Sequence, residues 1–84
     1  MCLALPGRIL SVHERDGMPM ARVDFQGAHQ DVCLVYVPEV QPGEWVLAHL
    51  GVALRQLDEP TALAELALLE EAGVLPDGSG AATG

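Results

Sequence analysis

The chain has 84 residues, which suits one domain, and its twelve acidic residues and four arginines give a formal net charge of −8. Binding to nucleic acid or to an anionic membrane surface depends on cationic side chains, so this charge argues against both partners. The sequence has no apolar run long enough to span a bilayer and no basic leader. We therefore expect a cytoplasmic protein whose two cysteines stay reduced.

Most of the chain predicts short β-strands separated by tight turns. Alternating or mostly apolar segments predict strands over residues 8–13, 20–25, 28–37, 45–50 and 52–57. Gln26-Gly27 is typical of a hairpin turn, and Pro38 should end the third strand or place it at an edge. Five short strands with tight turns indicate a mainly β fold, a small OB-like barrel, with a sandwich fragment as the alternative.

The last structured segment is predicted to be an α-helix over about residues 59–72. Asp58 can accept a backbone N–H as N-cap, and Gly73 suits the position after the last turn. Residues 1–75 then form a single domain. Residues 76–84 have no large apolar side chain, and we expect them to be a disordered tail.

One face of this helix should pack on the barrel. The expected stripe, with spacings of three and four, consists of Ala62, Leu63, Leu66 and Leu69. Leu68 falls on the opposite side. It is either an ordinary exposed leucine or part of an apolar strip that binds a partner protein.

Cys2 is the first candidate for chemistry. Removal of Met1 would place the thiol of Cys2 beside a free α-amino group. The neighbouring cation would favour the thiolate, and nitrogen and sulfur together could bind one metal ion. The residues alone equally allow an incidental cysteine at an unstructured terminus. Cys33 fits a partly buried structural thiol.

His49 is the second candidate. Alternation places it on one face of the fourth predicted strand with Trp45 and Leu47. A neutral imidazole there could bind a metal or donate to a partner. The structural alternative, which spacing alone favours, is a core histidine satisfied by a backbone carbonyl. We expect His13 and His29 to be structural.

The sequence contains no Cys-x-x-Cys pair, no phosphate-binding loop and no nucleophile elbow. We therefore expect a protein that is not an enzyme. A thiol enzyme with Cys2 as nucleophile would lack a nearby base. Two candidate ligands are also too few to complete a structural zinc site, so a bound metal would need further ligands from another protein.

Two segments together resemble the HypC/HupF chaperones of [NiFe]-hydrogenase maturation. Met1-Cys2-Leu3-Ala4-Leu5-Pro6-Gly7 is similar to the amino-terminal signature of this family. Residues 43–53 resemble its second motif, with Glu44-Trp45 where the family often has Asp-Tyr. The resemblance extends over about residues 1–72.

The resemblance implies an OB-like barrel that helps to assemble the iron centre, Fe(CN)2CO, with the partner HypD. It also implies delivery of this centre to the precursor of the hydrogenase large subunit. The essential cysteine of the family falls on Cys2 and its histidine on His49, so iron would be bound transiently and shared with a partner. Partner contacts are expected at Cys2, Leu3, Ala4, Leu5, Pro6, Gly7 and, from the helix pattern, Leu68. The alternative is an OB-like interaction module without metal chemistry.

Overall fold

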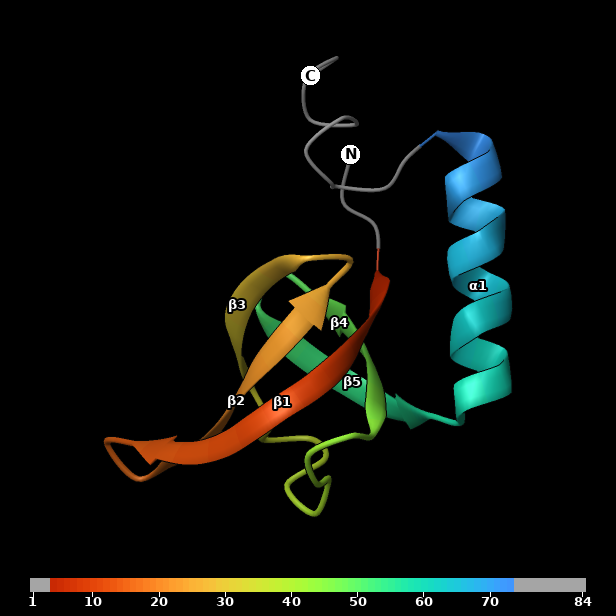
Figure 1. Ribbon diagram of the computed structural model, residues 1–84. Helices are drawn as coiled ribbons and strands as arrows, with labels where there is room; N and C mark the ends of the chain where they lie inside the picture. Colours follow the sequence, from red (N-terminus) through yellow and green to blue (C-terminus); the bar gives the residue numbers. More distant parts are fainter. Residues whose placement is uncertain (1–3, 74–84) are drawn as a thin grey trace.

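Five strands and one helix follow one another in the computed structural model, which describes residues 4–73. Their bounds are β1 Leu5–Arg15, β2 Met18–Phe25, β3 Ala28–Cys33, β4 Trp45–His49, β5 Val52–Leu57 and α1 Glu59–Ala72. The strands close into a barrel in the order β1-β2-β3-β5-β4, and α1 lies along its outside (Figure 1). The predicted mainly β barrel with a carboxy-terminal helix is confirmed. The predicted tail lies outside the described residues.

Strand β1 is longer at both ends than the sequence predicted. It pairs with β4 over Leu5 to Arg8 and with β2 from Arg8 to Arg15. The sequence prediction began at Arg8 because Pro6 and Gly7 are poor strand formers. In the fold, pairing with β4 holds this segment extended, an effect that local sequence does not reveal.

Strand β3 is shorter than predicted. It ends at Cys33, and Val35 and Tyr36 are exposed in the loop that follows. The ladder with β2 stops where Met20 faces Cys33, and one further backbone bond runs from Leu34 N–H to Pro19 O at 2.8 Å. Beyond this point β3 has no strand to pair with, because the β1–β2 hairpin extends away from the barrel (Figure 1).

Three connections between strands are two-residue turns in which both residues have positive φ. These pairs are Asp16-Gly17, Gln26-Gly27 and Leu50-Gly51. Such turns match the twist of antiparallel strands and favour Asn, Asp or Gly. The turn predicted at Gln26-Gly27 is confirmed, and Leu50 is the one bulky apolar residue among the six.

The barrel interior is filled by aliphatic side chains and one ring. The buried cluster consists of Ile9, Ala21, Val23, Phe25, Val32, Leu34, Val37, Val40, Val46, Ala48 and Ala53. Gly7 is part of this packing, because a Cβ atom there would lie 2.6 Å from Phe25 Cε1 and even closer to Val23 Cγ1. A glycine is therefore needed where β1 crosses the β2 side chains.

The outer surface carries one ion-pair cluster that joins three strands. The carboxylate of Asp31 on β3 lies 2.8 Å from Arg15 of β1 and 3.2 Å from Arg22 of β2. Hydrogen bonding by Arg22 is the main reason that the pKa of Asp31 is lowered from 3.8, with a further contribution from Arg15.

The helix touches the barrel along a narrower stripe than the sequence predicted. It packs on β1 and β4, with Ala62 and Leu66 buried and Leu69 half-buried. The prediction for Leu63 is wrong, because this side chain is 49% exposed. Positions i, i+4 and i+7 follow one line along a helix, whereas position i+1 lies about 100° around the axis. Only that line meets the curved barrel.

The ends of α1 agree in part with the predicted capping. Gly73 has φ 75°, and its N–H bonds to the carbonyl oxygens of Glu70 and Leu69, as expected after a last turn. Asp58 has the extended backbone of an N-cap, but its side chain makes no capping hydrogen bond, so this part of the prediction is wrong. Among the described residues, no helix has the length and hydropathy needed to cross a membrane.

Candidate functional site

The two sequence motifs lie on neighbouring strands. Leu5 of β1 pairs with Ala48 of β4, and Pro6 pairs with Leu47, in antiparallel register. The first described residues of the chain therefore run alongside the end of β4, where His49 lies. If Cys2 and His49 act at one site, as the family resemblance implies, the amino-terminal motif must lie close to residue 49 in this way.

His49 is the last residue of β4 and is half-buried. Burial alternates along this strand, with Val46 and Ala48 in the core and Trp45, Leu47 and His49 on the other face, as the sequence predicted. Within residues 4–73, no group forms a hydrogen bond with the imidazole. The structural alternative, a core histidine held by a backbone carbonyl, is therefore not observed.

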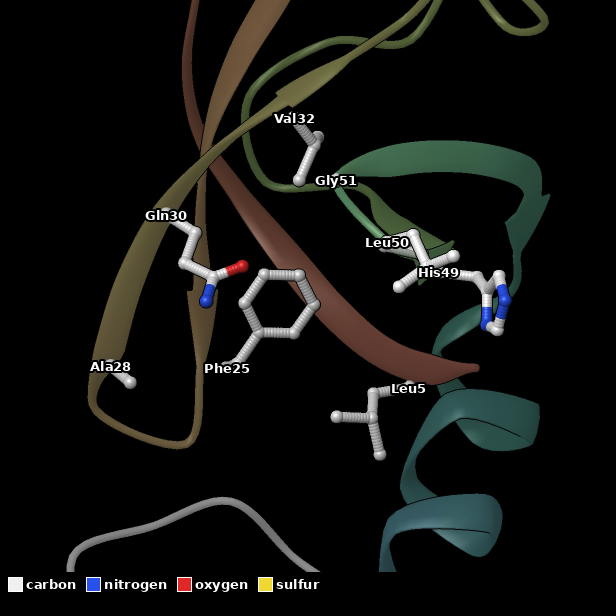
Figure 2. A pocket seen from close by; sticks show the side chains of 9 residues that line it. Leu5, Phe25, Ala28, Gln30, Val32, His49, Leu50 and Gly51 are labelled. Atoms are coloured by element: carbon white, nitrogen blue, oxygen red, sulfur yellow. The ribbon is translucent and has the colours of Figure 1, made fainter. Parts of the chain in front are cut away.

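A pocket of about 150 Å³ opens at this end of the barrel. It is lined by Leu5, Phe25, Ala28, Gln30, Val32, Ala48, His49, Leu50 and Gly51. Figure 2 shows the ring of Phe25 between β3 and the β4–β5 turn, with Leu5 beside it. Most of the lining residues are apolar, Gln30 and His49 are the polar ones, and the lining surface is only slightly more apolar than polar.

The other predicted contact residues divide into three groups. Cys2 and Leu3 lie outside the described residues. Ala4 and Leu5 are half-buried at the mouth of the barrel, whereas Pro6 and Gly7 are buried, which gives them a role in packing rather than an exposed surface. On α1, Leu68 is 65% exposed and does not line the pocket.

Leu50 was missed by the sequence reasoning. It is 77% exposed, lines the pocket beside His49, and has φ 54°. A left-handed backbone is unfavourable for a leucine. The available signal was its place before Gly51 in a two-residue turn, because such turns require positive φ at both positions.

The described residues do not form a metal site by themselves. Residues 4–73 contain no cluster of three or more His, Cys, Asp or Glu side chains that could bind a metal ion. Cys33 is a half-buried free thiol at the end of β3, and His13 and His29 are exposed and do not line the pocket. Of the two predicted metal ligands, Cys2 and His49, only His49 lies within the described residues 4–73, and it is at this mouth of the barrel.

Comparison with known proteins shows the family to which this chain belongs. The hydrogenase maturation factor HypC of Synechocystis sp. is 40% identical over 76 residues, which cover 88% of this chain and all of that protein. The maturation factor HybG of Escherichia coli K12 is 37% identical over 84% of this chain and 90% of its own length. HypC of Azotobacter chroococcum is 34% identical over all of this chain and 96% of its own length. The profile of the HupF/HypC family matches residues 1–69, and the chain belongs to this family.

Proposed function

We propose that this chain is a hydrogenase maturation chaperone that acts through Cys2 and His49. Its cargo would be the Fe(CN)2CO centre, assembled with a HypD-type partner and passed to the precursor of the hydrogenase large subunit. The chain would act in the cytoplasm as a carrier and not as an enzyme. The names of its relatives support the role in maturation. The cargo and the partners are our proposals.

The pairing of Leu5 with Ala48 is the observation that supports this function most directly. Cys2 is two residues before Ala4, and covalent geometry limits their Cα atoms to a separation of about 7 Å. In the proposed site, the thiol of Cys2 would lie at the same mouth of the barrel as the imidazole of His49. A thiolate and an imidazole are suitable ligands for iron, and an incomplete donor set leaves positions for ligands from a partner.

Single substitutions test this proposal. Cys2→Ala should leave the barrel folded, because a terminal side chain contributes little packing, but should abolish hydrogenase maturation. His49→Ala should reduce the iron recovered with the protein after co-expression with the partner. His13→Ala, at an exposed histidine of β1, is the matched control and should behave as the wild type.

Iron content and infrared spectra are the measurements. Iron should co-purify with the wild type, and its cyanide and carbonyl stretching bands should be absent from Cys2→Ala. Full hydrogenase activity with Cys2→Ala would contradict the proposal. Normal maturation by a wild-type protein that never carries iron would instead favour the alternative, an interaction module without metal chemistry.

A further inference from the structure

Strand β3 has a long unpaired edge. Along one side it pairs with β2 from Ala28 to Cys33, but on the other side β5 meets it only at the pair Cys33–Val52. The barrel is therefore closed on this side by one residue pair, which includes a bond from Cys33 N–H to Gly51 O at 2.8 Å. Among the described residues, the rest of this edge has no strand partner.

The hairpin geometry identifies the free backbone groups. In antiparallel strands, residues alternate between those that bond to the partner strand and those that point away from it. Phe25 and Ala28 flank a two-residue turn and form a bonded pair. By alternation, the N–H and C=O groups of His29, Asp31 and Cys33 point away from β2. The bond from Cys33 to Gly51 agrees with this alternation.

The free edge borders the pocket at the barrel mouth. Ala28, Gln30 and Val32 line one side of the pocket from β3, and Leu50 and Gly51 line the other side from the β4–β5 turn (Figure 2). An additional strand beside β3 would alternate its side chains between the pocket and the outside. About 150 Å³ of space lined mostly by apolar residues accommodates one aliphatic side chain.

We propose that the β3 edge binds an extended segment of a partner protein by strand addition. The free N–H and C=O groups of His29 and Asp31 select an extended backbone, and the pocket selects an aliphatic side chain. The net charge of −8 selects Lys or Arg at the flanks of that segment. The same charge opposes pairing with a second copy of this chain. Binding of a peptide at the β3 edge depends neither on iron nor on Cys2, so it can be tested independently of the proposed function.

A synthetic peptide tests strand addition directly. The probe is acetyl-Lys-Thr-Val-Thr-Val-Thr-Lys-amide, titrated into the ¹⁵N-labelled protein. We expect a Kd below about 1 mM and slowed hydrogen exchange at the amides of His29 and Asp31. The same peptide with alternate backbone amides N-methylated should not bind, since methylation removes its donors. A version with Glu in place of Lys should bind more weakly.

Two variants at one position provide a matched pair. His29→Pro removes an N–H from the free edge without removing a bond to β2, and should weaken peptide binding about tenfold, which corresponds to 1.4 kcal/mol. His29→Ala keeps the N–H and should bind as the wild type. If His29→Pro does not fold, the N-methylated peptide still decides the question on the wild type.

Three outcomes would overturn the proposal. The first is that the amides of His29 and Asp31 gain no protection with the Lys-flanked peptide. The second is equal binding of the N-methylated peptide. The third is protection that increases with protein concentration in the absence of peptide, which would identify a second copy as the occupant of this edge.

Discussion

At the scale of single residues, Leu50 combines an unfavourable backbone with high exposure. Its φ of 54° belongs to a turn position that suits Asn or Gly, and 77% of its surface is exposed. Nothing in the packing of the barrel requires a leucine there. Its place at the rim of the pocket beside His49 is instead consistent with an apolar contact made to a partner.

We therefore expect Leu50→Asn to increase stability while it impairs function. Removing the left-handed leucine should raise the free energy of unfolding by about 1 kcal/mol, measured by urea denaturation. Hydrogenase maturation should decrease. Leu54→Asn, at a partly exposed position of β5 where the ladder with β4 shifts register but φ is not positive, is the control and should give no gain in stability. If Leu50→Asn gained stability and kept full maturation, Leu50 would have no role in binding.

Gly7 gives the opposite case, a residue whose small size is required by packing. Gly7→Ala would place a methyl group 2.6 Å from the ring of Phe25, so β1 or the ring must shift. We expect a loss of about 1–3 kcal/mol in the free energy of unfolding. Gln56→Ala, at an exposed position of β5, should change it little. Equal stability of Gly7→Ala and the wild type would show that the barrel adapts more easily than its close packing implies.

At the scale of elements, the narrow contact of α1 distinguishes two leucines that the sequence treated alike. Leu66 is buried and Leu63 is 49% exposed. Leu66→Ala should lower the free energy of unfolding by about 2–5 kcal/mol, as for buried leucines in general. Leu63→Ala should change it by less than about 1 kcal/mol. Thermal and urea denaturation of both variants would show the difference, and equal losses would contradict the assigned contact face.

The outer face of α1 provides a separate test, since Leu68 is 65% exposed. Leu68→Asp should leave the melting temperature nearly unchanged, because the side chain packs on little. If the outer face binds a partner, the same change should weaken complex formation with the hydrogenase precursor in a pull-down assay. Unchanged binding would make α1 a structural brace and leave the barrel mouth as the partner surface.

At the scale of the whole molecule, the cluster around Asp31 links three strands and makes stability depend on pH. The two arginines lower the pKa of Asp31 below 3.8 in the folded protein, so the folded state favours the carboxylate more than the unfolded chain does. The resulting stabilisation is present above the unfolded pKa and is lost as the pH falls through the folded pKa.

Asp31→Asn should therefore be less stable than the wild type near neutral pH, and this difference should disappear on acidification to about pH 2. Urea denaturation across this range is the measurement. The difference should also shrink in high salt, because the cluster is exposed to solvent. Glu14→Gln, at an exposed carboxylate of β1, should show no such pattern. A constant difference at all pH values would rule out the ion pairs as its cause.

Local patterns predicted the order of strands and helix, because alternation and turn residues act over a few positions. The start of β1 at Leu5 and the end of β3 at Cys33 were not predictable, since pairing with distant strands determines both. At the candidate site, the sequence identified His49 from its strand and motif. For Leu50 the sequence offered only its place before Gly51 in a two-residue turn, because its exposure and its position beside the pocket depend on the fold.

The pairing of β1 with β4 also determines when the proposed site can form during synthesis. The β1–β2 and β2–β3 hairpins rest on local contacts, but Leu5 meets Ala48 only after β4 has left the ribosome. Such non-local pairing is a late step in folding. If Cys2 and His49 form one iron site as proposed, a nascent or misfolded chain would present the cysteine without the histidine. Completion of the barrel would then restrict iron loading to molecules that have finished folding.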